Sequence, residues 1–212
     1  MEPEIERYAA DDAFREEARR ADGPRVRVYR PPGPAIVLGA GSRPGVELHL
    51  ERCAEDRVAV FRRAGGGCAV VLDAGNVIVS VAYPTAGFWG NRMHFERISA
   101  WLIDALVRVG IPRPRMEGAS DLAIADRKVA GACLHRTRDQ LYYSASLLVD
   151  PDVSLIARYL KHPPREPEYR RGRHHLDFLR PLSALVPGAT AARLEEALPS
   201  ALDPSRLVLP CP

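Results

Sequence analysis

The chain has 212 residues, of which 46% are hydrophobic and 27% charged, and its formal net charge is +3. The composition is typical of a soluble globular protein, and the length suits one domain over residues 1–212. The net charge is too small to indicate nucleic-acid binding. No apolar run reaches the roughly 18 residues of a membrane span, and the acidic N-terminus lacks a signal-peptide core. We therefore expect a cytoplasmic protein with neither nucleic acid nor a membrane as partner.

Apolar periodicity predicts helices and strands that alternate along the chain. The clearest helix covers residues 91–109, where Phe95 and Ile98 recur at helical spacing and Gly110 follows. The expected elements, in chain order, are helix 11–21, strands 26–29 and 35–38, helix 46–57, strands 58–61, 68–72 and 77–83, helix 91–109, two strands around a turn at Asp126, strand 141–149 and helix 153–160. Because the strands after Ser120 come as consecutive hairpins, we expect an α+β fold with a largely antiparallel or mixed sheet flanked by helices.

The most informative segment is Arg62-Arg63-Ala64-Gly65-Gly66-Gly67-Cys68, which joins two of the expected strands. Successive N–H groups in a glycine-rich turn can form a cradle for an anion, and an adjacent arginine adds a planar, permanent cation. Taken alone, a glycine triplet is more often a plain flexible turn.

A second informative segment covers residues 120–131 and predicts a strand, a tight turn at Asp126-Arg127 and a strand that opens with Lys128. A lysine beside small residues such as Gly131 can point into a cleft and hold a phosphate or carbonyl oxygen. The alternative is a solvated lysine in a hairpin.

Together, the two segments resemble the lipoate–protein ligase family. Its pattern is Arg-Arg-x-x-Gly-Gly-Gly-x-Val-x-His-Asp, followed by Asn-Asp-(Leu/Ile) and Gly-Lys-Lys-(Ile/Val)-(Ala/Ser)-Gly. The resemblance covers about residues 26–185. It implies a fold of the class II biotin/lipoate ligase type. It also implies that lipoate is activated with ATP and Mg²⁺ as lipoyl-AMP and transferred to a lysine of a lipoyl-carrier protein domain.

The same resemblance assigns roles to individual residues. Lys128 matches the catalytic lysine, which would lie between the carboxylate and the α-phosphate of the activated acid. Ser120 and Asp121 match the Asn-Asp pair and would help to hold Mg²⁺, which prefers oxygen ligands. The residues that match the ATP- and acyl-adenylate-binding positions are Arg63, Gly65, Gly66, Gly67, Cys68, Ala69, Val70, Val71, Asp73 and Gly131. Val77, Val79 and Val81 could line the acyl pocket, although ordinary core explains them as well.

Four departures from the family pattern concern the substrate and the strength of catalysis. The third glycine aligns with Cys68, which would strain the loop by about 1 kcal/mol if it needed a positive φ; otherwise the loop follows a different path. Leu72 replaces a histidine, Ser120 replaces an asparagine, and Tyr-Ser-Ala at 143–145 replaces His-His-Gly.

Family members often carry an additional C-terminal domain of about a hundred residues. In some of them a separate subunit takes the place of that domain, so a separate accessory subunit is a possible partner.

Other functions stay open at this point. Related octanoyltransferases use a cysteine nucleophile, and Cys68 or Cys133 could serve, although buried inert thiols explain both. The four cysteines have no zinc spacing, and a third ligand is lacking beside His174 and His175. The longer arginine-rich loop of biotin ligases is absent. A subunit that binds lipoyl-AMP or a lipoyl domain without turnover is a further alternative.

The segment 158–180 is rich in arginine. It could receive an acidic lipoyl domain or contact ATP phosphates. It could equally be a solvated loop, because prolines and acidic residues are interspersed.

Overall fold

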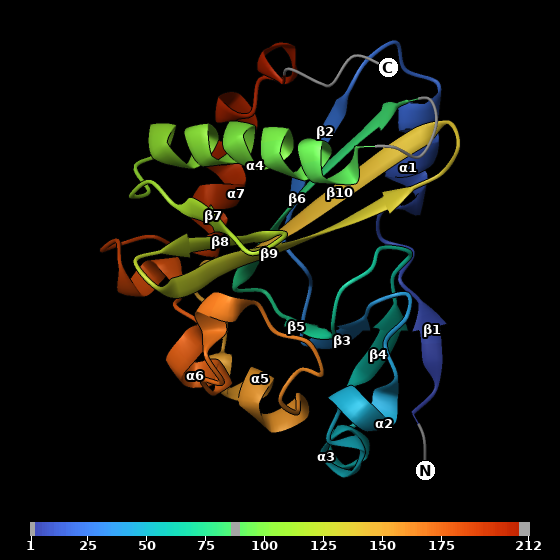
Figure 1. Ribbon diagram of the computed structural model, residues 1–212, viewed down its shortest axis with the longest axis vertical. Helices are drawn as coiled ribbons and strands as arrows, with labels where there is room; N and C mark the ends of the chain where they lie inside the picture. Colours follow the sequence, from blue (N-terminus) through green and yellow to red (C-terminus); the bar gives the residue numbers. More distant parts are fainter. Residues whose placement is uncertain (1–2, 86–89, 208–212) are drawn as a thin grey trace.

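The computed structural model describes residues 3–85 and 90–207, whose strands form two β-sheets (Figure 1). The larger sheet is antiparallel, in the order β2 (Arg25–Tyr29), β6 (Asn76–Pro84), β10 (Gln140–Leu148), β9 (Arg127–Arg136), β8 (Asp121–Ile124) and β7 (Arg115–Glu117). The smaller sheet is mixed, in the order β1 (Ile5–Arg7), β4 (Ala59–Arg62), β3 (Ala35–Leu38) and β5 (Val70–Leu72). The predicted α+β fold is confirmed.

The main core lies between one face of the larger sheet and the helices α4 (Asn91–Arg108) and α7 (Ala191–Ala201) (Figure 1). Strand residues that alternate along β6 and β10 enter this core. Val77, Val79 and Val81 are among them and are fully buried, so they belong to the core and do not line a pocket. Within the described ranges, none of the helices combines the length and apolar character that a membrane span needs.

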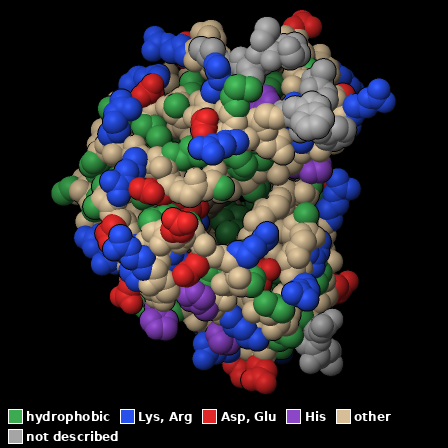
Figure 2. Space-filling view, viewed as in Figure 1, with side chains coloured by type: hydrophobic (Ala, Val, Ile, Leu, Met, Phe, Trp, Pro, Cys, Tyr) green, Lys and Arg blue, Asp and Glu red, His purple; other side chains and the backbone are tan. Residues whose placement is uncertain are grey.

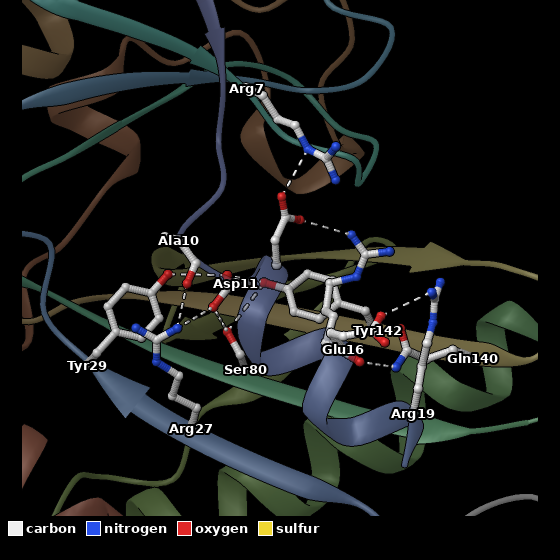
Figure 3. Close-up of polar contacts among 12 residues, drawn as sticks. Arg7, Ala10, Asp11, Glu16, Arg19, Arg27, Tyr29, Ser80, Gln140 and Tyr142 are labelled. Carbon is white, nitrogen blue, oxygen red and sulfur yellow. Dashed lines mark hydrogen bonds and ion pairs between the residues drawn. The ribbon is translucent and has the colours of Figure 1, made fainter. Parts of the chain in front are cut away.

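The opposite face of the larger sheet carries α1 (Asp12–Arg19) and the smaller sheet. A buried carboxylate fixes α1 there, because Asp11 accepts hydrogen bonds from the hydroxyl groups of Tyr142, Tyr29 (3.2 Å) and Ser80 (3.3 Å) (Figure 3). Burial raises the pKa of both tyrosines, so their hydroxyl groups remain proton donors. The predicted helix over 11–21 is confirmed, with its ends at Asp12 and Arg19.

The prediction of one helix over residues 46–57 is wrong. The segment forms two short helices, α2 (Pro44–Glu47) and α3 (Leu50–Glu55), separated by extended backbone. Leu48 lies between them, is fully buried and forms an isolated β-bridge with Leu160. Val46, which the helical spacing placed on an apolar face, is 41% exposed. Tertiary pairing has therefore overridden the local periodicity.

The segment 161–178, here called the strap, spans the two sheets. It follows α5 (Val153–Tyr159) and contains α6 (His175–Phe178). At its two ends, Leu160 pairs with Leu48 beside the smaller sheet and Leu179 pairs with Lys128 of the larger sheet. The sequence predicted α5 but not α6, nor the elements β1, β7 and α7.

Candidate functional site

Lys128, the predicted catalytic lysine, lies at the start of β9. Its Nζ lies 2.7 Å from Oδ1 of Asp121 on the neighbouring strand β8, and its side chain is 24% exposed. A Cβ atom on Gly131 would lie 2.7 Å from the same Nζ. The lysine side chain therefore lies along its own strand, over a residue that has no side chain.

A β-bulge gives Lys128 this direction. The register between β8 and β9 shifts between Leu122 and Ala123. As a result, Val129 and Ala130, although adjacent, are both buried in the main core. In a regular strand, Lys128 would share the core-facing side with Ala130, because side chains alternate. The bulge instead turns Lys128 to the face of Gly131.

The second oxygen of Asp121 accepts a hydrogen bond from the hydroxyl group of Tyr169 in the strap (3.0 Å). Burial raises the pKa of Tyr169, so this group donates. Both oxygens of Asp121 are thus engaged, and an ion there would compete with Lys128 or Tyr169. Residues 3–85 and 90–207 contain no cluster of three His, Cys, Asp or Glu side chains that could hold a metal. Magnesium binding by Ser120 and Asp121 stays a prediction.

The glycine-rich loop between β4 and β5 lies on the same face of the larger sheet as the ammonium group of Lys128. A Cβ atom on Gly65 would be 2.8 Å from Sγ of Cys133, which shares the face of Gly131. The left-handed backbone falls on Gly67 (φ +91°), and Cys68 has no positive φ. The strain considered for Cys68 therefore does not arise, because the preceding glycine absorbs the turn.

Arg63 holds the loop in its path. Its guanidinium group donates to the carbonyl oxygens of Val37 (2.9 Å), Gly66 (2.7 Å) and Cys68 (2.9 Å). Arg62 similarly donates to the carbonyl oxygens of Gly39 and Ser42, both at 2.9 Å. The two arginines therefore fix the backbone around the loop.

Glu47 is a site residue that the sequence analysis missed. Its carboxylate is buried and accepts a hydrogen bond from the backbone N–H of Ala69 at 2.6 Å. A glutamate within an expected amphipathic helix looks solvent-facing in the sequence, so no local signal distinguished it. Glu47 thus fixes the end of the loop from the side of α2.

The strap contacts both the glycine-rich loop and the strand residues beside Lys128. The Sγ atom of Cys68 lies 3.8 Å from the carbonyl oxygen of Arg165. Pro167 packs closely on Gly118, where an added Cβ atom would lie 3.0 Å from the proline Cβ. Tyr169 then reaches Asp121, as described above.

Arg170 of the strap is a second site residue without a clear sequence signal, since it is one arginine among many. It is only 4% exposed, and its guanidinium group lies 4.9 Å from the ring centre of Phe178. Its Nε donates to the carbonyl oxygen of Arg173 (3.0 Å) and lies 3.5 Å from Glu166. Within the described ranges its buried Nη2 has no hydrogen-bond partner. Burial lowers the pKa of this arginine.

Not every predicted residue joins this arrangement. Asp73 lies beyond the far end of β5, where its carboxylate accepts hydrogen bonds from the N–H groups of Gly75 and Asp152, both at 2.8 Å. Val71 is buried in the core on one face of the smaller sheet, whereas Val70 packs against the cluster of Val37, Leu72 and Ile78 on the other face.

The thiol of Cys133 is poorly suited to nucleophilic chemistry. Burial raises its pKa, whereas a nucleophile needs a thiolate near neutral pH. Cys53 is buried, with its pKa raised by the same cause. Cys211 lies outside the described residues.

A hollow opens in the region between the two sheets. Figure 2 shows it near the centre of the viewed face, with hydrophobic side chains at its bottom and a Lys or Arg side chain at its edge. On the same face of β9 and β10 as Gly131, the small residues Ser144 and Ser146 stay partly exposed. The glycine-rich loop, the lysine held by Asp121 and the hollow therefore lie together, an arrangement typical of the class of sites that bind small molecules.

The comparison with known proteins narrows this class. Residues 5–202 match the family described as the lipoyl protein ligase A/B catalytic domain. The chain therefore belongs to that family. A curated relative, a probable lipoate-protein ligase A of Mycoplasma pneumoniae, is 31% identical over 125 residues, which make up 59% of this chain. The match spans 36% of that relative, so the chain corresponds to about a third of its length.

Solved structures support the fold. A bipartite lipoate protein ligase of Thermoplasma acidophilum, described with its E2 lipoyl domain, has a TM-score of 0.76 and 20% identity, covering 95% of this chain and 82% of that one. A putative lipoate protein ligase of the same organism with bound lipoic acid has a TM-score of 0.76 and 18% identity, covering 95% and 84%. A lipoate-protein ligase A bound with ATP has a TM-score of 0.75 and 19% identity, with the same coverage.

Proposed function

We propose that this chain is a lipoate–protein ligase, which activates lipoate with ATP and transfers the lipoyl group to a lysine of a lipoyl-carrier domain. The observation that carries this proposal is the position of Lys128, held by Asp121 on the sheet face that also carries the glycine-rich loop. Membership of the lipoyl protein ligase family supports it.

The reaction would run in two steps. A carboxylate oxygen of lipoate attacks the α-phosphorus of ATP, and the bond to pyrophosphate breaks, which leaves lipoyl-AMP. The neutral amine of the carrier lysine then attacks the lipoyl carbonyl carbon. The bond to AMP breaks, and the amine loses a proton as the amide forms.

Lys128 would serve both steps by electrostatic stabilisation. Negative charge builds on the phosphate oxygens in the first step and on the carbonyl oxygen in the second, and a fixed ammonium group lowers the energy of both transition states. Asp121 and Gly131 would act as positioning residues, because one holds the ammonium group and the other leaves space for it.

The loop residues would bind the nucleotide and the acyl phosphate. We assign this role to the segment from Gly65 to Val70, with Arg63 fixing the backbone from within. Asp73 and Val71 would contribute only through the shape of β5. The buried Nη2 of Arg170, which has no hydrogen-bond partner among the described residues, supports a role for this arginine as a further cation for the phosphate, because a buried donor without an acceptor is rare in folded proteins.

We also propose that residues 1–212 act as one catalytic domain and use a lipoyl domain as acceptor. The bipartite archaeal ligase, described with its E2 lipoyl domain, supports this partner. The description of that relative as bipartite also supports a separate accessory subunit for the activation step.

Intact-mass spectrometry of an apo lipoyl domain tests the proposal. One tube would contain the pure chain, Mg²⁺, lipoate and ATP; a second would contain chemically made lipoyl-AMP in place of lipoate and ATP. A lipoyl mass shift in both tubes shows a self-sufficient ligase. A shift with lipoyl-AMP alone shows a transferase that needs an activating partner. If neither tube shows a lipoyl mass shift, the proposal is contradicted.

A cysteine-dependent transfer from an acyl carrier would give a different result. Cys133→Ser and Cys68→Ser should each keep transfer from lipoyl-AMP within about three-fold of wild type, because the proposed reaction uses no thiolate. Loss of activity in only one of them would indicate a thioester route.

A further inference from the structure

The strap and the residues after it carry a surplus of positive charge beside the site. Residues 161–180 contain six lysines and arginines against three acidic side chains, a net charge of +3, which equals that of the whole chain. Arg170 lies near Glu166, and Arg173 pairs with Asp126. In the part of the chain that the structure describes, Lys161, Arg165, Arg171 and Arg180 form no ion pair, and Glu168 and Asp177 offset part of their charge.

Exposed apolar side chains accompany these cations. Leu176 of α6 is 53% exposed, the highest value among the large hydrophobic side chains of the described ranges, and Val46 of α2 is another such residue. Lys161 joins the two helices, because its Nζ donates to the carbonyl oxygen of Gly45 (2.8 Å) and its own carbonyl oxygen lies 3.0 Å from Nε2 of His175. Lys161 therefore contacts the sequence neighbours of both exposed apolar residues, Gly45 beside Val46 and His175 beside Leu176.

We call this surface the rim patch; it consists of Val46, Lys161, Arg165, Arg171, Leu176 and Arg180. It adjoins Lys128 directly, since Leu179 forms a β-bridge with Lys128 and the N–H group of Arg180 donates to the Lys128 carbonyl oxygen (2.9 Å). Figure 2 shows basic and histidine side chains, interspersed with acidic ones, below the hollow and over the region of α6.

We propose that the rim patch is the docking surface for the acceptor domain. The partner would be a small domain that presents its target lysine beside an acidic surface and an apolar side chain. This inference rests on the proposed function, because that function requires a protein lysine to reach the acyl group near Lys128. A lysine side chain is short, so the domain that carries it must stand against the rim of the site.

Charge and apolar contact would contribute differently to docking. The unpaired cations would attract an acidic partner over a distance and raise the association rate, an effect that salt screens. Leu176 would be buried in the contact and would mainly slow dissociation, since apolar side chains at the centre of an interface provide much of its binding energy. The apolar contact through Leu176 would persist at high salt.

Two substitutions test the surface, and each has a matched control. Leu176→Glu and Arg165→Glu change an exposed leucine and an exposed arginine of the rim patch. Val107→Glu on α4 and Arg25→Glu on β2 change comparable exposed side chains outside it. For each variant we would measure the Kd of an apo lipoyl domain, kcat and KM for transfer from chemically made lipoyl-AMP, the Kd of lipoyl-AMP, and the melting temperature.

The expected result is a rise of ten-fold or more in KM and Kd for the lipoyl domain with both rim-patch variants. The Kd of lipoyl-AMP should stay within about two-fold of the wild-type value. The melting temperature should stay within a few degrees of that of wild type. The effect of Arg165→Glu should shrink between about 0.05 and 0.3 M salt, whereas that of Leu176→Glu should persist. Both controls should behave like wild type.

Other outcomes overturn the inference. If Arg165→Glu weakens lipoyl-AMP binding as much as acceptor binding, the cations serve the nucleotide instead. If the rim-patch variants and the controls have equal KM values, the acceptor docks elsewhere. If the wild-type chain binds lipoyl-AMP but transfers nothing to the lipoyl domain, the proposed function fails, a result that is separate from any difference between variants.

Discussion

Gly131 lies directly beneath the ammonium group of Lys128, so that a single added carbon would stand 2.7 Å from the lysine Nζ. The contact joins two residues of one strand, and a β-bulge makes it possible by turning Lys128 to the face of Gly131. The position of the proposed catalytic group thus depends on the absence of a side chain three residues further on.

Gly131→Ala should separate activity from stability. The atom that the new Cβ meets is the end of a flexible side chain, so the free energy of unfolding should change by no more than about 1 kcal/mol. Lys128 must move away from the site face, and transfer from lipoyl-AMP should fall at least ten-fold. Gly23→Ala is the control, because its Cβ would meet nothing within 4 Å. Unchanged activity in Gly131→Ala would refute the positioning role.

Asp121→Asn tests whether the carboxylate acts through Lys128. Removal of its charge should free the ammonium group and lower kcat about ten- to a hundred-fold, whereas Lys128→Ala should lower kcat about a thousand-fold or more, to a residual rate that a single-turnover assay measures. Because residues that act as a unit are not additive, the double variant should be no slower than Lys128→Ala alone. A further loss in the double variant would show that Asp121 has an independent role, such as the predicted binding of magnesium.

Gly39→Ala should destabilise the fold. A Cβ at this position would lie 1.9 Å from the carbonyl oxygen of Gly67, and backbone cannot move away as easily as a side chain. We expect a loss of about 1–3 kcal/mol in urea unfolding. Gly41→Ala, where the Cβ meets nothing within 4 Å, should be close to wild type. Equal midpoints for the two variants would contradict the close packing of the loop.

Arg170→Gln should weaken ligand binding more than it weakens the free protein. The substitution removes a buried Nη2 that has no partner among the described residues, but also the Nε hydrogen bond to Arg173 and the packing on Phe178, so the unliganded melting temperature should fall. The Kd of lipoyl-AMP should rise at least ten-fold if this group meets the phosphate. Arg171→Asn is the control, because residue 171 is exposed and asparagine tolerates its positive φ of 53°. Equal affinities would exclude Arg170 from the phosphate site.

His94 should make stability depend on pH. Its Nδ1 lies 2.6 Å from the hydroxyl group of Tyr83, and burial lowers its pKa to about 4. Because the pKa of the unfolded chain is about 6.5, the unfolded state takes up the proton first. The stabilising contribution is therefore present above pH about 6.5 and is lost as the pH falls towards 4. Urea unfolding of His94→Gln should show a smaller decline across this range; an equal decline would refute the assignment.

The sequence predicted most of the sheet, because periodicity and turns are local properties. The strands around the Asp126 turn appear where expected, as β8 and β9. The helix over 46–57 failed because Leu48 pairs with Leu160, a contact that no local pattern records. Short edge strands such as β1 and β7 depend in the same way on distant partners.

The site could be predicted in its residue types but not in its contacts. The resemblance singled out Lys128 and the glycine-rich loop, yet strict alternation would place Lys128 on the core side, and only the bulge reverses this. Glu47 and Arg170 were missed because their roles come from burial against segments far away in the chain. Asp73 shows the opposite case, since it matches the pattern but holds a turn at the far end of β5.

The two anchored ends of the strap also affect the biosynthesis of the protein. Protein synthesis proceeds from the N-terminus, so the loop and Lys128 leave the ribosome before residues 161–179. Leu179 pairs with Lys128 across about fifty residues of later sequence. The β-bridge between Leu179 and Lys128 can therefore form only after the glycine-rich loop and the whole strap have been synthesised. Closure of this side of the site is thus a late step in the folding of a newly made chain.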